Sequence, residues 1–238
     1  MNYYFITGSS KGLGKALTEL LLNDEENVVY GISRTNDINH QQFKHIQIDL
    51  TDLDAVKQFH FPELKDATAI TLINNAGIVG DINYLGNLDC DKIISTYNLN
   101  LITPTLLINQ FTKTYNNKLS KLVINISSGA GRNAIDGWSV YCATKAGLDM
   151  LSLVFKEEIQ NKNLNINILS LSPGIIDTGM QEDIRRADES NFSNIERFIA
   201  YKNNGDLAAP ASTANLIAKF ISDKTLQENT ICSVRDIS

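Results

Sequence analysis

The stretch Tyr3–Leu21, YYFITGSSKGLGKALTELL, carries the clearest structural signal in this chain. Tyr3 to Thr7 is a short apolar run typical of a buried strand, and leucines at helical spacing follow from Leu13. The turn between them, Gly8-Ser-Ser-Lys-Gly12-Leu-Gly14, lets the backbone bend sharply and approach a ligand, and free N–H groups at a helix start favour an anion such as a pyrophosphate. We therefore expect a strand, a glycine turn and a helix, although an ordinary tight turn would show the same glycines.

Two other motifs overlap the same turn. Gly8-Ser-Ser10-Lys-Gly12 has the form G-x-S-x-G of a hydrolase nucleophile elbow, but that mechanism needs an acid and then a histidine later in the chain. The histidines, His40, His45 and His60, all lie within the first sixty residues. A Walker phosphate loop needs Ser or Thr after Gly-Lys, whereas Gly14-Lys15 is followed by Ala16. A hydrolase with Ser10 as its nucleophile is therefore the weaker interpretation.

Apolar runs alternate with helical patterns along the rest of the chain. Within each run the apolar residues are continuous, which is typical of parallel strands covered on both faces. We predict one domain of residues 1–238 with a doubly wound α/β fold, a Rossmann-like parallel sheet with helices on both faces. The further expected strands are Asn27–Ser33, Lys44–Leu50, Ala69–Asn74, Lys121–Ser127, Asn165–Leu171 and Thr230–Val234, and the expected later helices include Asp91–Phe111, interrupted near Pro104, and Pro210–Ile221.

The end of the second expected strand bears on the ligand. Ligands of such folds bind at the carboxyl ends of the strands, and there an acid about 20 residues past the glycines would hold a ribose 2′-hydroxyl. This chain has Ser33-Arg34 instead, and an arginine accommodates a 2′-phosphate. Arg34, with Lys11 inside the glycine turn, therefore indicates NADP(H). A solvated arginine without a partner is the alternative.

A second group of chemically useful residues lies in Ser128–Lys145, SGAGRNAIDGWSVYCATK. Tyr141 and Lys145 are four residues apart, so they share one face if the segment is helical. A phenol has a pKa of roughly 10 and a nearby ammonium favours the phenolate, so we expect Lys145 to lower the pKa of Tyr141. Ser128 follows an expected strand and could face the start of this helix. The Tyr-x-x-x-Lys pair is weak evidence alone, because chance also supplies such pairs.

Composition limits the kinds of partner. A net charge of −6 and a pI of about 5.1, with no basic cluster denser than Arg185-Arg186, argue against nucleic acid and anionic membranes. Small molecules are the expected partners. No apolar run approaches the ~18 residues of a membrane span, and strand-like sequence from Tyr3 leaves no room for a signal peptide. Because Cys90, Cys142 and Cys232 lack disulfide or metal-ligand spacing, we expect free thiols, no metal and a cytoplasmic location.

Taken together and in order, these motifs resemble the classical short-chain dehydrogenase/reductase family over essentially the whole chain. The family's T-G-x-x-x-G-x-G appears at Thr7–Gly14, its N-N-A-G at Asn74–Gly77, and its Tyr-x-x-x-Lys at Tyr141 and Lys145. The family's serine thirteen residues before the tyrosine matches Ser128, its helix asparagine matches Asn100, and its Pro-Gly turn with a following threonine matches Pro173, Gly174 and Thr178.

Within the family, four blocks resemble the benzil reductase and sepiapterin reductase branch, which reduces vicinal dicarbonyl compounds with NADPH. The blocks are residues 125–131, 137–142, 172–178 and 197–202. The resemblance implies an NADPH-dependent carbonyl reductase that converts one carbonyl of a benzil-like 1,2-diketone to an α-hydroxy ketone. Sepiapterin reductases anchor their pterin with an aspartate near the C-terminus, which Asp236 could match, so this activity is the alternative. A non-enzymatic NADP-sensing module is another, although it need not keep Ser128, Tyr141 and Lys145.

The resemblance also implies roles for individual residues. Tyr141 would donate a proton to the carbonyl oxygen, Ser128 would hydrogen-bond that oxygen, Lys145 would also hold the nicotinamide ribose, and Asn100 would position a water for proton return. The implied catalytic residues are therefore Asn100, Ser128, Tyr141 and Lys145. The implied cofactor residues are Gly8, Ser10, Lys11, Gly12, Leu13, Gly14, Ser33, Arg34, Asp49, Leu50, Asn75, Ala76, Gly77, Tyr141, Lys145, Pro173, Gly174, Ile176 and Thr178.

The segment 175–206 is polar and irregular without a strong core stripe, and we expect it to form a lid over the substrate. If the helix has already begun at Trp138, three residues before Tyr141, Trp138 shares the same face and can form an apolar wall, with Met180 and Phe198 opposite. Such a pocket suits a flat aromatic dicarbonyl and has no obvious anchor for a phosphate or carboxylate. The expected substrate residues are Ser128, Trp138, Tyr141 and Met180. The family commonly pairs its long central helices, which implies a homodimer or homotetramer.

Overall fold

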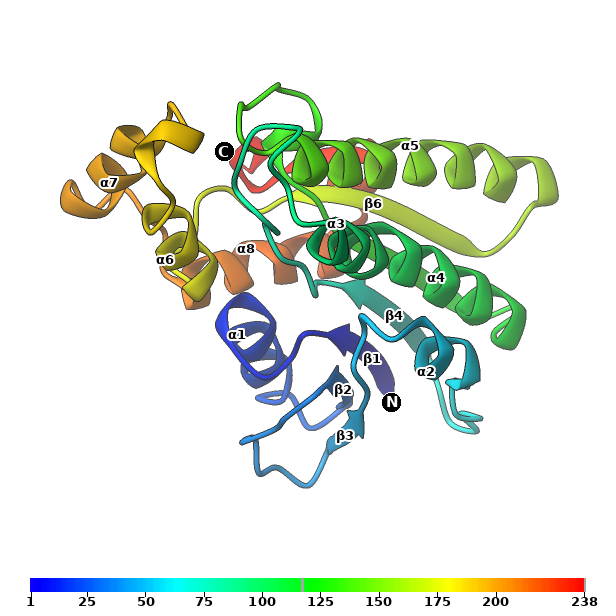
Figure 1. Ribbon diagram of the computed structural model, residues 1–238. Helices are drawn as coiled ribbons and strands as arrows, with labels where there is room; N and C mark the ends of the chain where they lie inside the picture. Colours follow the sequence, from blue (N-terminus) through cyan, green and yellow to red (C-terminus); the bar gives the residue numbers. More distant parts are fainter. Residues whose placement is uncertain (117, 238) are drawn as a thin grey trace.

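The computed structural model describes residues 1–116 and 118–237 (Figure 1). Its centre is a seven-stranded sheet in the order β3-β2-β1-β4-β5-β6-β7, in which every neighbouring pair is parallel. The predicted doubly wound, Rossmann-like fold is therefore confirmed, and each predicted strand is present with small shifts at its ends. The strands are β1 (Asn2–Thr7), β2 (Asn27–Ser33), β3 (Phe43–Gln47), β4 (Ala69–Asn74), β5 (Ser120–Ile126), β6 (Ile166–Ser172) and β7 (Ile231–Ser233).

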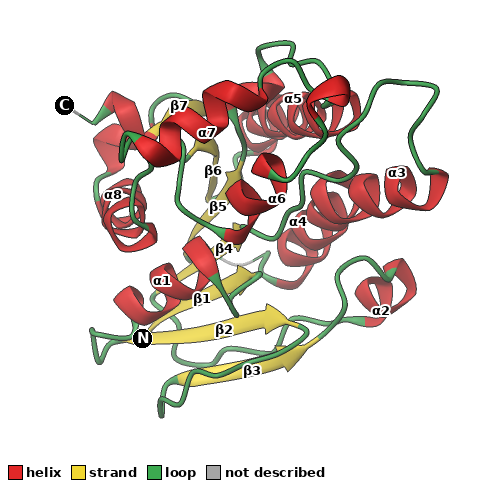
Figure 2. Ribbon diagram, turned by 60° about the vertical axis from the view of Figure 1, so that its left-hand side comes forward, coloured by secondary structure: helices red, strands yellow, loops and turns green. Residues whose placement is uncertain are grey.

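Helices cover both faces of the sheet (Figures 1 and 2). α1 (Gly12–Leu21) and α8 (Pro210–Ser222) pack on one face, and α2 (Leu53–Gln58), α4 (Thr103–Thr114) and α5 (Ser139–Lys162) on the other. The chain reverses its direction of winding between β1 and β4, so the carboxyl ends of these neighbouring strands leave a crevice. None of the described helices has the length and apolar character needed to cross a membrane.

The inner strands β1, β2, β4, β5 and β6 are largely buried on both sides, which explains their apolar sequences, whereas the edge strand β3 is partly exposed and more polar than predicted. Successive side chains of a strand point to opposite faces. Phe5 and Ile6 of β1 accordingly belong to the two different core clusters, and each is 0% exposed. If one face of such a strand were polar, the helices on that face of the sheet would have no apolar side chains to pack against.

The connection between β2 and β3 departs from the predicted alternation of strands and helices. Residues 34–42 form a loop without a helix. A helical crossover between parallel strands usually needs a dozen or more residues, and this segment is shorter and rich in Asn and Asp, which favour turns. The loop leaves the Arg34 side chain exposed at the edge of the crevice.

The long helical stretch after β4 contains a π-helical turn. α3 (Cys90–Tyr97) continues into the π-helical segment Asn98–Ile102 and then into α4. The predicted interruption therefore falls just before Pro104, which occupies the first turn of α4, where its missing N–H costs little. Single π turns often occur at functional sites, and this one contains Asn100.

Residues 175–206 are more ordered than the sequence predicted. They form α6 (Gly179–Arg185), a 3₁₀ turn (Glu189–Asn191) and α7 (Ile195–Asn203), beyond the carboxyl ends of the strands (Figure 1). Ile184, Phe192 and Phe198 are buried in a cluster with Trp138. We expected this segment to have no strong stripe of apolar core residues, and this was wrong. Its buried apolar side chains pack against Trp138, just before α5, and not against the sheet. Further 3₁₀ turns are Gly129–Gly131, Lys224–Gln227 and Val234–Asp236.

Candidate active site

A cavity of about 1360 Å³ at the carboxyl ends of the strands brings together predicted residues from the whole chain. All four predicted substrate residues line it. The predicted cofactor residues also line the cavity, except Gly14, which lies behind the turn. The predicted catalytic residue Asn100 does not line it either. The lining cofactor residues are Gly8, Ser10, Lys11, Gly12, Leu13, Ser33, Arg34, Asp49, Leu50, Asn75, Ala76, Gly77, Tyr141, Lys145, Pro173, Gly174, Ile176 and Thr178.

The glycine turn has a shape that side chains would prevent. Gly8 and Gly12 have φ values of 69° and 56°, in the left-handed region that favours glycine. A Cβ on Gly14 would lie 2.3 Å from the carbonyl oxygen of Gly8. Gly14 therefore acts by allowing the first turn of α1 to pack against the loop, although it does not reach the cavity.

The loop after β4 braces this turn. Asn75 Nδ2 donates to the carbonyl of Thr7 at 2.9 Å, and Thr7 Oγ1 accepts the N–H groups of Asn75 and Ala76 at 2.9 and 3.0 Å. The side chain of Ser33 is similarly occupied, since it is buried and donates to the carbonyl of Thr35 at 2.7 Å. Asn75 and Ser33 therefore shape the cavity wall mainly through bonds within the protein.

Arg34 and Asp49 form the charged rim at the end of β2 and β3. The Arg34 side chain is 72% exposed, and its Nη1 lies 4.0 Å from Asp49 Oδ2. Hydrogen bonds from the backbone N–H and the hydroxyl of Thr51 lower the pKa of Asp49, and Arg34 contributes to the same effect. At this distance and exposure the ion pair is weak, so the Arg34 guanidinium remains able to meet an anionic ligand.

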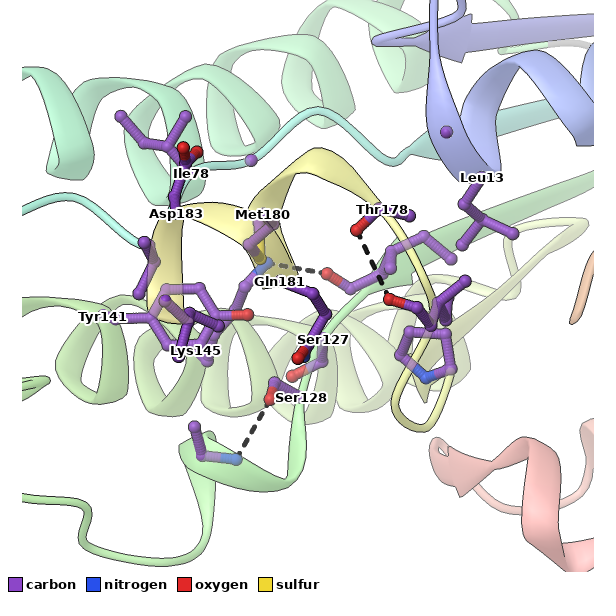
Figure 3. A pocket seen from close by; sticks show the side chains of 18 of the residues that line it. Leu13, Ile78, Ser127, Ser128, Tyr141, Lys145, Thr178, Met180, Gln181 and Asp183 are labelled. Atoms are coloured by element: carbon purple, nitrogen blue, oxygen red, sulfur yellow. Dashed lines mark hydrogen bonds between the residues drawn. The ribbon is translucent and has the colours of Figure 1, made fainter. Parts of the chain in front are cut away.

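Tyr141, Lys145 and Ser128 converge on one part of the cavity (Figure 3). Tyr141 and Lys145 lie one turn apart near the start of α5, and Ser128 follows β5. Lys145 Nζ donates to the carbonyl of Ile126 at 2.8 Å and lies 5.7 Å from the centre of the Tyr141 ring. The Tyr141 hydroxyl is hydrogen-bonded with Ser128, whose Oγ also accepts the N–H of Ala130 at 3.1 Å.

Burial dominates the charge state of this group. It raises the pKa of Tyr141 to about 12, and the hydrogen bond with Ser128 offsets this only in part. Burial also lowers the pKa of Lys145 to about 8, although the nearby carboxylate of Asp149 acts in the opposite direction. The predicted lowering of the Tyr141 pKa by Lys145 is smaller than this effect of burial and stays a prediction. Tyr141 holds its proton at neutral pH, which is the form that an acid needs.

Asn100 is a structural clamp in this arrangement. Its Oδ1 accepts the N–H of Ile78 at 3.0 Å, and its Nδ2 donates to the carbonyl of Ile78 at 2.8 Å. The same Nδ2 lies 3.3 Å from the hydroxyl of Thr144 on α5. The side chain thus ties the loop after β4 to the helix that carries Tyr141 and Lys145.

Aromatic rings form the wall beside Tyr141. Trp138 is stacked on Phe192 at 5.4 Å and makes an edge contact with Tyr141 at 5.5 Å between ring centres. Trp138 does not yet belong to the helix, because it is the residue before the first turn of α5. It still lines the cavity, together with Met180 and Phe198 from the segment 175–206.

Sequence reasoning missed three arginines, Arg132, Arg197 and Arg235, that also line the cavity. Arg235 follows the carboxyl end of β7, so the rule that ligands bind at strand ends could have found it. The neighbouring Asp236, proposed as a pterin anchor, does not line the cavity. Its Oδ2 accepts the N–H of Ser233 at 2.7 Å and caps the last 3₁₀ turn.

The chain belongs to the short chain dehydrogenase family, whose model matches residues 2–189. It is therefore an oxidoreductase that acts between carbonyl and alcohol groups. Its relatives place it in the branch predicted from the sequence blocks. The benzil reductase ((S)-benzoin forming) of Bacillus subtilis is 40% identical to it, over 99% of this chain and 99% of that one.

Two more distant proteins extend the comparison. Sepiapterin reductase of Rattus norvegicus is 28% identical, over 98% of this chain and 95% of that one. The structure of 4-hydroxyisoleucine dehydrogenase complexed with NADH is 25% identical and has a TM-score of 0.79, over 98% of this chain and 96% of that one. Both span nearly the whole chain, so the likeness includes the sheet and the segment that follows β6.

Proposed function

We propose that this protein is an NADPH-dependent reductase of 1,2-dicarbonyl compounds, which converts one carbonyl of a benzil-like diketone to the α-hydroxy ketone. The observation that carries the proposal is the protonated, buried Tyr141 hydroxyl beside Ser128 and an aromatic wall. The similarity to a benzil reductase over the full length supports it. By analogy with that relative we expect benzil to give (S)-benzoin.

In the proposed mechanism, Tyr141 donates its proton to the carbonyl oxygen as negative charge develops there. Ser128 hydrogen-bonds the same oxygen and orients the Tyr141 hydroxyl. Lys145 supplies a positive charge near Tyr141 and Ser128, and the hydrogen bond from Lys145 Nζ to the carbonyl of Ile126 fixes the position of the ammonium group. Asn100 acts as a positioning residue, since it holds Ile78 and α5 in register. A water for proton return at Asn100 stays a prediction.

The residues of the crevice fit a dinucleotide. A Cβ at Gly14 would displace the Gly8 turn, and the start of α1 at Gly12 and Leu13 lines the cavity, where the free N–H groups of a helix start favour an anion. We propose that Arg34 and Lys11 bind a 2′-phosphate, and that Thr178 and Gly174 lie against the nicotinamide half. A bound NADPH would supply the hydride. The residues of this chain bind and orient it and exclude water.

We further propose that residues 175–206 act as a substrate lid within one domain of residues 1–238. Its apolar side chains already reach Trp138, and Met180 faces the cavity. Closure of such a segment would exclude water from the reacting carbonyl.

We propose a homodimer or homotetramer in the cytoplasm, with no nucleic acid or membrane partner. The support for assembly is a set of exposed apolar side chains on α3, the π turn and α5, namely Ile94, Ile102, Met150, Leu153 and Val154. Sedimentation velocity measures the mass directly, and a monomer at micromolar concentration would contradict this assembly.

Sepiapterin reduction is the second candidate, favoured by similarity to the rat enzyme. The position of Asp236 weighs against it, because that carboxylate caps a turn outside the cavity. A protein that binds NADP without catalysis is disfavoured by the joint presence of Ser128, Tyr141 and Lys145.

A substrate panel tests the proposal. NADPH absorbance is followed with benzil, smaller diketones, sepiapterin and simple monoketones, and the product of benzil is resolved on a chiral column. We expect benzil to have the highest kcat/KM. Faster turnover of sepiapterin would favour the second candidate, and binding of NADPH without turnover of any carbonyl would favour the sensing module.

A further inference from the structure

The cavity has a basic side that an aromatic diketone alone would not need. Arg132 follows β5 and Arg235 follows β7, and both line the cavity with Ser172 and Ser233, the last residues of β6 and β7. Ser172 and Ser233 are paired in the sheet register. Arg132 Nη2 donates to Ser172 Oγ, so the Arg132 guanidinium lies at the end of β6. Arg235 follows two residues after Ser233, at the end of the neighbouring strand β7.

The two arginines differ in how far their charge is balanced. Arg132 Nε lies 3.5 Å from Asp149 Oδ2, and Asp149 Oδ1 accepts hydrogen bonds from Ser127 and Ser170 at 2.6 and 2.5 Å. Arg235 has an exposed side chain and no ion pair with any residue that the structure describes. Arg235 therefore contributes an uncompensated positive charge to this side of the cavity.

Acidic residues of the cavity lie elsewhere. Asp183 belongs to α6, away from the ends of β6 and β7 in sequence, and also lines the cavity. Asp206 follows α7, and Asp49 lies beyond β3 near Arg34. Asp236, the closest acid to Arg235 in sequence, is held by the N–H of Ser233 at 2.7 Å. The β6–β7 side consequently presents arginine and serine donors to a ligand.

We propose that this side of the cavity binds a carboxylate carried by the dicarbonyl substrate, with Arg235 as the main contact and Arg132 and Ser233 beside it. The inference rests on the proposed function and refines its substrate class to an acidic aryl 1,2-dicarbonyl. An arginine fork matches a carboxylate with two charge-assisted hydrogen bonds. This proposal departs from the expectation that the pocket has no obvious anchor for a carboxylate. A pterin ring carries no carboxylate, so this contact would favour an acidic aryl dicarbonyl over it.

The test compares benzil-4-carboxylate with its methyl ester, which differ in charge but hardly in shape. For the unmodified protein we expect kcat/KM to be about five- to tenfold higher for the acid, and the advantage to shrink as salt is added. In Arg235→Gln the advantage should disappear, while kcat/KM for the ester and the NADPH Kd stay within about twofold. Lys224→Gln is the matched control, because it also removes one positive charge, and Lys224 is exposed and does not line the cavity.

A binding assay separates this proposal from the proposed function. Trp138 is the single tryptophan of the chain and lines the cavity, so its fluorescence reports ligands without any turnover. We expect 4-benzylbenzoate, which has no carbonyl to reduce, to bind about fivefold more tightly than its methyl ester, and only when Arg235 is present. Equal affinity of acid and ester, an advantage that survives in Arg235→Gln, or loss of NADPH affinity in that variant would each overturn the carboxylate site. Failure to reduce any dicarbonyl would instead overturn the proposed function.

Discussion

The cofactor end and the substrate end of the cavity are built from different kinds of contact. At the proposed cofactor end, the backbone of Gly8 and Gly12 forms the surface, and Asn75 and Thr7 brace it with hydrogen bonds. At the substrate end, side chains from separate segments, among them Trp138, Phe198 and Arg235, form the surface. A change at the first end alters backbone shape and should affect every substrate equally. A change at the second should separate one substrate from another.

The largest effect is expected where the two ends meet, at Tyr141. Tyr141→Phe keeps the ring and its packing on Trp138 but removes the proton donor, so kcat/KM for benzil should fall by ~10² to 10⁴-fold. NADPH affinity, measured by fluorescence titration, should be unchanged. Reduction at the normal rate in this variant would show that Tyr141 is not the acid.

The next effect concerns the cofactor end. In Gly14→Ala the new Cβ would lie 2.3 Å from the Gly8 carbonyl and 2.5 Å from Asn75 Nδ2, so the turn must move. We expect the free energy of unfolding to fall by ~1–3 kcal/mol and NADPH to bind more weakly, with the ranking of substrates preserved. Gly179→Ala is the control, because nothing lies within 4 Å of its added Cβ. Denaturant unfolding of both variants checks the difference, and equal stabilities would contradict it.

Arg34 tests cofactor choice without any change in backbone shape. Loss of a charge-assisted pair of hydrogen bonds should weaken NADPH binding by roughly 10- to 100-fold in Arg34→Ala, and NADH binding much less. Isothermal titration with both nucleotides gives the ratio. If the unmodified protein uses NADPH and NADH equally, the charge argument fails.

The pH profile should reflect Lys145 more than Tyr141. Burial lowers the pKa of Lys145 to about 8 and raises that of Tyr141 to about 12, so the ammonium is lost first as pH rises. We expect kcat/KM for reduction to decline as pH increases through about 8. The unfolded chain keeps its Lys145 proton to higher pH, so this group makes the folded state more stable above pH 8, and unfolding would not explain the decline. A flat profile between neutral pH and pH 10 would contradict this assignment.

The smallest effect is expected at the aromatic wall of the substrate end. Trp138→Ala should raise KM for benzil by roughly three- to tenfold, because the variant loses aromatic stacking surface. The value of kcat and the NADPH affinity should change less, because the catalytic groups remain. Trp138→Phe should retain most of the affinity. Far-UV circular dichroism confirms that each variant is folded. An equal rise in KM for a small aliphatic diketone would mean that the wall does not select aromatic substrates.

Local patterns predicted much of this molecule. The apolar runs predicted all seven strands, since a strand buried on both faces cannot contain a polar stripe. The glycine spacing predicted the turn before α1, because few residues other than glycine adopt its positive φ values. The Tyr141–Lys145 spacing predicted that both side chains share one helix face, which one turn of helix requires.

The amino-acid sequence thus determined the fold and most of the residues that enter the crevice, because strand burial, glycine conformation and helical spacing are local properties. Only the tertiary structure decided the charge state of Tyr141 and Lys145, because burial depends on the whole surrounding core. It also decided which side chain after β7 enters the cavity. Asp236 turns back to cap a 3₁₀ turn and Arg235 lines the site, and only the conformation of that turn distinguishes these neighbouring residues.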